Sequence, residues 1–248
     1  MVENCNEQTL RPLIIGHRGA AGEAPENTLA SFELAVRQGA DAVELDVHLT
    51  ADGELVVCHD HTVNRTTDGQ GRIDQMTVEQ IKRLDAGRWY DERFRGERIP
   101  LLSEVFAALP ANVMINVEVK CGYSDKLSGW LAELLAGFGR LETTVVSSFS
   151  HKVLYRLKQR EPAIRVGLLY VADLVRHSVL AETAGMDVYS LHPQYQAIGP
   201  EDVAEAQRHG LRVYPFTINE PEHLRQAVQA GCSGIITDFP ARLKAMLG

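Results

Sequence analysis

Two carboxylates and one histidine interrupt a stretch that otherwise has the composition of buried β-strands. The stretch is VELDVHLTADGELVVCHD, residues 43–60, and its interruptions are Glu44, Asp46 and His59. Successive side chains of a strand point to opposite faces, so Glu44 and Asp46 share one face and apolar residues take the other. Unpaired carboxylates on an inward face cost several kcal/mol, and two of them also repel each other. A bound divalent cation would offset both costs, so this pattern predicts a metal site.

The same stretch predicts an antiparallel hairpin. Only the polar residues TADGE separate strand 42–49 from strand 54–59, which leaves no room for a crossover helix. A turn centred on Ala51-Asp52 places Glu44 opposite His59, and directly opposed residues share a face. The imidazole is therefore expected beside the two carboxylates.

A third acid and a lysine occur in a later strand. The run VMINVEVK, residues 113–120, alternates apolar residues with Asn116, Glu118 and Lys120. An oxygen-binding cation held chiefly by protein needs more than two carboxylates, and Glu118 is the best candidate for the third. Lys120 lies on the same face of the predicted strand.

A histidine and an arginine end the first apolar run. His17 and Arg18 come where the strand LIIGH gives way to the Gly-rich loop RGAAG. An arginine beside backbone N–H groups forms an anion site, and its planar fork suits phosphate. Asn27 is predicted to cap the next helix and receives no chemical role.

Short apolar runs alternate with helical segments along the chain. The segments that begin at Gly199 and Glu220 each carry Pro in the first turn and Gly after the last, as helices do. About eight strand–helix units in one chain predict a TIM-type (β/α)8 barrel. A doubly wound open sheet is the alternative, disfavoured because no GxGxxG motif or P-loop opens a helix. The apolar runs are 13–17, 42–47, 54–59, 113–120, 143–149, 164–171, 187–192, 211–218 and 234–239.

The polar segment 60–100 breaks this rhythm. It is rich in Arg and Asp, and the capping box Thr77-x-x-Gln80 marks its one short helix. We expect a single barrel domain over residues 1–248, with 60–100 as a small insertion on its rim.

Composition and charge exclude several classes of function. The net charge of −8 argues against a nucleic-acid-binding surface and requires a local positive centre for any anionic substrate. The four cysteines form no CxxC pair, residues 1–12 have no apolar signal core, and no run is long enough to span a membrane. These features predict a reduced, cytoplasmic protein without stable membrane association. A homodimer is compatible with the sequence, which leaves the oligomeric state open.

Together these residues resemble a known signature. His17-Arg18, Glu44-x-Asp46 and His59-Asp60 are similar to the HR…ExD…HD signature of glycerophosphodiester phosphodiesterases. The resemblance covers nearly the whole chain, because INVEVK and GIITDFP also resemble later active-site strands of that family. It implies a TIM-type barrel that hydrolyses glycerophosphodiesters to glycerol 3-phosphate and an alcohol with one divalent cation, Mg²⁺ or Ca²⁺.

The resemblance also implies roles for single residues. They are the metal ligands Glu44, Asp46 and Glu118, the acid–base histidines His17 and His59, and the phosphate-binding Arg18 and Lys120. Phe216 stands where the family usually has Trp, and His192 is a further candidate for the pocket wall. The likeness to phospholipase-C-like barrels suggests that the glycerol 2-hydroxyl attacks first and that water then opens a cyclic phosphate.

Two other functions are compatible with these residues. One is action on lysophospholipids, as a lysophospholipase D or a cyclising phosphodiesterase, which would need an apolar groove. The polar segment 60–100 favours small water-soluble diesters instead. The other is a non-catalytic, metal-dependent phosphodiester binder, which would tolerate loss of one histidine, whereas both are present.

Overall fold

Eight parallel strands form a nearly closed barrel, as the sequence predicts. The structure, a computed structural model, describes residues 11–120, 122 and 124–248. The strands follow the order β8-β7-β6-β5-β4-β2-β1-β9 around the barrel. Backbone hydrogen bonds from Ser233 N to Val213 O and from Ile218 N to Ile236 O bring the two ends of this series together. The strands are β1 (Leu13–His17), β2 (Ala42–Leu49), β4 (Met114–Val119), β5 (Thr144–Ser148), β6 (Arg165–Tyr170), β7 (Ser190–Pro193), β8 (Arg212–Val213) and β9 (Gly234–Thr237).

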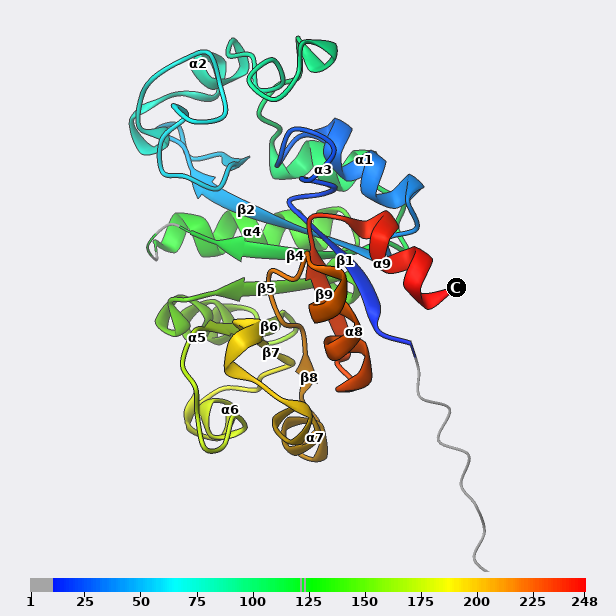
Figure 1. Ribbon diagram of the computed structural model, residues 1–248. Helices are drawn as coiled ribbons and strands as arrows, with labels where there is room; N and C mark the ends of the chain where they lie inside the picture. Colours follow the sequence, from blue (N-terminus) through cyan, green and yellow to red (C-terminus); the bar gives the residue numbers. More distant parts are fainter. Residues whose placement is uncertain (1–10, 121, 123) are drawn as a thin grey trace, which may run out of the picture.

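Helices cover the outside of this barrel (Figure 1). Phe32 of the first helix and Leu45 of β2 belong to one apolar layer between helices and sheet, which leaves the even-numbered side chains of β2 facing the barrel interior. The seventh and eighth helices begin with Pro, as predicted. The helices are α1 (Leu29–Arg37), α3 (Leu102–Ala108), α4 (Asp125–Gly137), α5 (His151–Arg160), α6 (Val179–Thr183), α7 (Pro200–Arg208), α8 (Pro221–Gln229) and α9 (Pro240–Leu247). Among the described residues, no helix has the length and apolar character that crossing a bilayer would require.

The hairpin after β2 is present, but its predicted register is wrong by one residue. The short strand β3 (Leu55–Val57) runs antiparallel to β2, and its last residue pairs with Val47. The turn contains three residues rather than two, and Gly53 at its end has φ +94°, a left-handed conformation that glycine adopts freely. His59 therefore lies beyond the paired residues and not opposite Glu44.

Residues 60–100 extend beyond the carboxyl end of β2 (Figure 1). They contain α2 (Val78–Lys82) and two 3₁₀ turns, η1 (Ile73–Gln75) and η2 (Glu92–Phe94). The predicted capping box of Thr77 and Gln80 is present at α2. The segment packs around a small apolar cluster that it shares with the hairpin: Val56, Cys58, Val63, Ile73, Ile81, Ala86 and Ile99. One barrel domain with this insertion stays a prediction.

Candidate active site

Three predicted acids meet inside the barrel near the carboxyl ends of its strands. Glu44 and Asp46 point inward from β2, and Glu118 does so from β4, where it is the register partner of Asp46. All three side chains are buried, and one carboxylate oxygen of each lies within 4.8 Å of the others. Parallel pairing of β2 with β4 thus brings together acids that are far apart in the sequence.

Two predicted cations surround this acid cluster. Lys120 Nζ lies 2.7 Å from Glu118 Oε1 and 3.2 Å from Asp46 Oδ1. Arg18 Nε lies 3.4 Å from Asp46 Oδ2. The Arg18 backbone N–H donates to Glu44 Oε2 at 3.0 Å, in a turn where Arg18 has φ +52°. A left-handed conformation costs a non-glycine residue energy, and here it accompanies a backbone amide that donates to a site carboxylate.

Burial governs the pKa values of the acids. Burial raises the pKa of Glu44 well above its usual range, and repulsion from Asp46 and Glu118 adds to the shift. Burial raises the pKa of Glu118 to about 7. Burial also acts to raise the pKa of Asp46, but Lys120 and Arg18 outweigh it and hold that pKa below the ordinary value. The cluster therefore resists full ionisation, and an added cation would favour the ionised forms.

The cluster fits a divalent cation. Its donors are carboxylate oxygens, the ligands that Mg²⁺ and Ca²⁺ prefer. Asp46 Oδ1 is buried and receives no well-directed hydrogen bond from the part of the chain that the structure describes. The sequence prediction of Glu44, Asp46 and Glu118 as one ligand set is therefore compatible with the geometry.

His17 is held by an acid from the far end of the chain. Its Nδ1 donates to Asp238 Oδ1 at 2.6 Å, and Asn219 Nδ2 donates to Asp238 Oδ2 at 2.5 Å. The hydrogen bond to the carboxylate places the proton on Nδ1 and leaves Nε2 directed to the acid cluster, 3.9 Å from Glu44 Oε2. His17 is thus oriented with a free nitrogen in the site.

His59 is held in the same way by the residue that follows it. Its Nδ1 donates to Asp60 Oδ1 at 2.7 Å. Arg65 binds Asp60 through Nε at 2.9 Å and also makes a two-point contact with Glu26. Glu26 in turn accepts from Arg18 at 2.7 Å, so this chain of ion pairs leads back to the site. Burial lowers the pKa of His59, which favours a neutral imidazole.

Sequence reasoning assigned Asn27 wrongly. The cap of α1 is Thr28, whose hydroxyl accepts from Ser31 N. Asn27 is buried with φ +58°, and its Nδ2 donates to Asp46 Oδ2 at 2.8 Å. Asn and Asp both occur before helices and in left-handed turns, so the residue type alone did not separate the two roles.

Two other residues beside the histidines were also missed. Asp238 orients His17 from 221 positions away, although GIITDFP had been noted as a family-like strand. His48 Nε2 donates to the backbone carbonyl of His59 at 3.1 Å. His48 shares the inward face of Glu44 and Asp46, and this alternation was the available signal.

The two residues predicted to line the substrate pocket, His192 and Phe216, differ in burial. His192 is fully buried in the barrel, with Nε2 in a 2.8 Å hydrogen bond to Ser190 Oγ, and burial lowers its pKa to about 3. Phe216 is only partly buried, and its ring meets that of Phe149 edge-on at 5.9 Å. The place of the partly accessible Phe216 in a pocket wall stays a prediction, whereas the fully buried His192 belongs to the barrel core.

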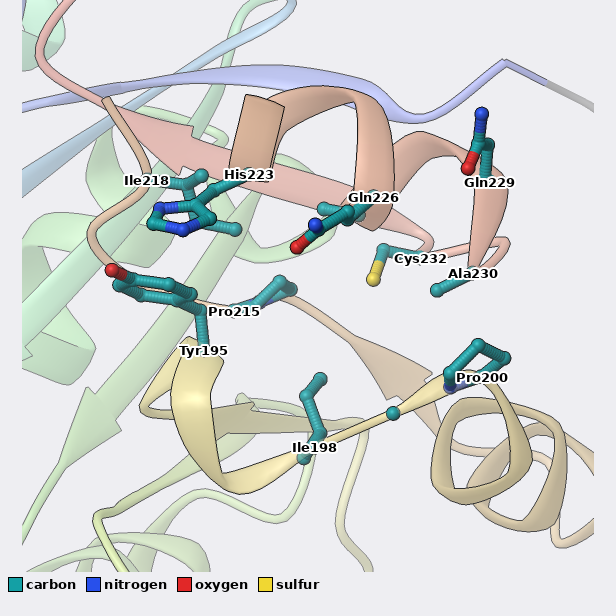
Figure 2. A pocket seen from close by; sticks show the side chains of 12 residues that line it. Tyr195, Ile198, Pro200, Pro215, Ile218, His223, Gln226, Gln229, Ala230 and Cys232 are labelled. Carbon is teal, nitrogen blue, oxygen red and sulfur yellow. The ribbon is translucent and has the colours of Figure 1, made fainter. Parts of the chain in front are cut away.

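A separate pocket lies between η4 (Tyr195–Ala197) and α8 (Figure 2). It has a volume of about 280 Å³, and the rings of Tyr195 and His223, with centroids 5.1 Å apart, form part of its lining. Its lining includes none of the predicted catalytic, substrate-binding or metal-binding residues. This pocket is not part of the site described above.

Two solved structures similar to this one are described as phosphodiesterases. A phosphodiesterase from Oleispira antarctica, in complex with the product sn-glycerol-3-phosphate, superposes with a TM-score of 0.89 at 32% identity over 96% of this chain and 97% of that chain. A glycerophosphodiester phosphodiesterase from Agrobacterium tumefaciens superposes with a TM-score of 0.84 at 31% identity over 94% and 99% of the two chains. The fold and the site together define a barrel enzyme of the phosphodiesterase class.

The sequence comparisons specify the family. The model of the glycerophosphoryl diester phosphodiesterase family matches residues 17–242. The glycerophosphodiester phosphodiesterase of Caldanaerobacter subterraneus is 41% identical over 239 residues, which cover 94% of this chain and 97% of that one. The chain belongs to the glycerophosphoryl diester phosphodiesterase family, and the resemblance found in the sequence is confirmed.

Proposed function

We propose that this enzyme hydrolyses glycerophosphodiesters to glycerol 3-phosphate and an alcohol, with one divalent cation and with His17 and His59 as the acid–base pair. One observation carries the proposal. Each histidine donates an Nδ1–H hydrogen bond to a carboxylate. His17 Nε2 lies 3.9 Å from Glu44 of the buried acid cluster, and the charge of Asp46 in the same cluster acts on His59. The product sn-glycerol-3-phosphate bound to the Oleispira phosphodiesterase supports the same substrate class.

Glu44, Asp46 and Glu118 would hold the cation, either Mg²⁺ or Ca²⁺. When bound, it would supply positive charge next to the non-bridging phosphate oxygens, on which negative charge accumulates in the transition state. Arg18 and Lys120 would bind the same oxygens from the protein side, because their charged groups already border the acid cluster. The overall charge of −8 makes this local positive centre necessary.

The two imidazoles would move the protons. One removes the proton from the glycerol 2-hydroxyl, whose oxygen attacks phosphorus while the bond to the alcohol oxygen breaks. The other imidazole protonates that departing oxygen. In the second step the now neutral imidazole takes a proton from water, which opens the cyclic phosphate, and the first imidazole returns its proton to the 2-oxygen. Both histidines end in their starting states.

Glycerol 3-phosphate release from glycerophosphocholine tests the proposal. EDTA should abolish activity, and Mg²⁺ or Ca²⁺ should restore it, whereas full activity in metal-free buffer would refute the metal dependence. A diester that lacks the glycerol 2-hydroxyl should not be cleaved, and its rapid hydrolysis would rule out the cyclic route. Cytoplasmic location and a homodimer stay predictions from the sequence.

A further inference from the structure

Apolar side chains are exposed beside the mouth of the barrel. Phe149 follows the last residue of β5 and is 49% exposed, and Val171 follows the last residue of β6 and is 61% exposed. Val175, in the loop between β6 and α6, is fully exposed. Because β5 and β6 are neighbours, these residues come from adjacent loops at the carboxyl end of the barrel. We call Phe149, Val171 and Val175 the apolar lip.

The lip is continuous with the active site. The ring of Phe149 contacts the ring of Phe216 at a centroid distance of 5.9 Å, and Phe216 is the predicted aromatic wall of the substrate pocket. Residues 60–100, beyond the carboxyl end of β2, are rich in charged side chains, although Trp89 among them is 40% exposed. The lip gathers three exposed apolar side chains on two adjacent loops, which gives the mouth a preferred orientation toward an apolar phase.

Helix α5, which begins two residues after Phe149, is strongly basic. It contains Lys152, Arg156, Lys158 and Arg160 and no acidic residue, in a protein whose net charge is −8. Lys158 bonds to Ile164 O and Asp187, so Lys152, exposed in the first turn of the helix, is the cation on which the contact with lipid would depend. Lys152 and Arg156 are one helical turn apart and border a hollow of about 360 Å³ between α5 and α6, together with the half-exposed Tyr155. The hollow thus carries two cationic side chains and a phenol at its edge.

Exposed apolar side chains beside cations and an aromatic residue are the combination that binds an anionic lipid surface. The neighbouring loop adds no net positive charge, because it carries Asp173 and its Arg176 pairs with Glu182 and Glu205. The attraction must therefore come from α5. The negative charge of the whole protein would repel such a surface, so a contact requires a local cationic face. We propose that the apolar lip and Lys152 of the basic helix α5 dock reversibly on anionic lipid surfaces, with the barrel mouth facing the lipid.

This inference goes beyond the proposed function and does not depend on it, since binding is measured without turnover. The test is sedimentation of the enzyme with vesicles of equal parts phosphatidylglycerol and phosphatidylcholine, and with vesicles of phosphatidylcholine alone. Binding should be restricted to the anionic vesicles and should weaken with salt. Val175→Asp should reduce it at least tenfold, and Val175→Trp should increase it.

Charge-reversal variants test whether lipid binding depends on α5 or on the total charge of the protein. Each unit of charge near an anionic membrane changes binding about fivefold, so Lys152→Glu should weaken it about 25-fold. Arg208→Glu, in the last turn of α7 at the opposite end of the barrel, should leave binding unchanged. Hydrolysis of water-soluble glycerophosphocholine should be the same in all four variants, which shows that they are folded. Wild-type enzyme that remains in the supernatant with anionic vesicles, or equal effects of the two reversals, would overturn the proposal.

Discussion

The two histidines are held by the same contact but in different surroundings. His17 and His59 each donate Nδ1–H to an aspartate, at 2.6 and 2.7 Å. The partner of His17, Asp238, is bound from behind by the neutral amide of Asn219, in loops that follow β8 and β9. The partner of His59, Asp60, is bound by the guanidinium of Arg65 within the insertion.

This difference sets how much negative charge each carboxylate offers its imidazole. Arg65 and His59 both lower the pKa of Asp60, since the carboxylate accepts hydrogen bonds from the Arg65 guanidinium and from the His59 imidazole. His17 likewise lowers the pKa of Asp238, against the effect of burial, but there the other hydrogen bond comes from an amide without charge. We infer that the barrel itself orients His17, whereas an ion-pair network orients His59 and couples it to Arg18.

The largest expected effect is loss of either imidazole. His17→Ala and His59→Ala should each lower kcat about 10²–10⁴-fold, because each removes a proton-transfer group. Circular dichroism and urea unfolding should show folded variants. A substrate with a p-nitrophenol leaving group needs no protonation of the leaving oxygen, so it should largely restore the variant that lacks the first-step acid. Equal restoration of both variants would contradict a division of roles.

Removing the charge of each aspartate should sharpen the comparison. Asp238→Asn should lower kcat about 10²-fold with little change in KM, since it disturbs only the orientation of His17. Asp60→Asn should lower kcat to a similar extent and should also raise KM. Without the Asp60 charge, Arg65 should interact more strongly with Glu26 and weaken the hydrogen bond by which Glu26 positions Arg18. Steady-state kinetics on glycerophosphocholine separates the two patterns. Identical patterns would mean that the ion-pair network does not reach the phosphate site.

The sequence predicted those parts of the site that depend on strand alternation. Glu44, Asp46 and Glu118 share a face because alternate residues of a strand do so, and the parallel pairing of β2 and β4 brought them together. The partner of His59 was within reach of sequence reasoning, since Asp60 is its neighbour. The partner of His17 was not, because barrel closure alone brings Asp238 beside β1.

The two errors have local physical causes. A single residue in a left-handed conformation, Gly53, lengthened the turn and moved the hairpin register by one position. Asn27 was taken for a helix cap because its side chain can bond to backbone groups, but the neighbouring Thr28 fills that role. Both errors arise where a residue type is compatible with two backbone conformations.

A smaller effect is expected on the pH dependence. Without Arg65, the pKa of Asp60 should rise toward its ordinary value, and the carboxylate, still ionised near neutrality, should interact more strongly with the imidazolium of His59. The pKa of His59, which burial lowers, should therefore increase. For Arg65→Ala we expect the limb of the kcat/KM–pH profile that His59 sets to move to higher pH by about half a unit to one unit, whether His59 acts first as base or as acid. Asn219→Ala removes no charge and should leave that limb in place, and a shift in both variants would contradict the distinction.

The same two variants should also differ in stability, and here Asn219→Ala should have the larger effect. Arg65 is 44% exposed, and exposed ion pairs contribute about 0–1 kcal/mol, so Arg65→Ala should change the free energy of unfolding by less than about 1 kcal/mol. Asn219 accepts from the backbone N–H of Asp238 at 2.9 Å and donates to its carboxylate, so Asn219→Ala leaves part-buried groups without partners and should cost about 1–3 kcal/mol. Urea unfolding of the two variants measures both values. A larger loss of unfolding free energy for Arg65→Ala would mean that the contacts behind His59 in the insertion stabilise the protein more than the contacts behind His17 in the barrel.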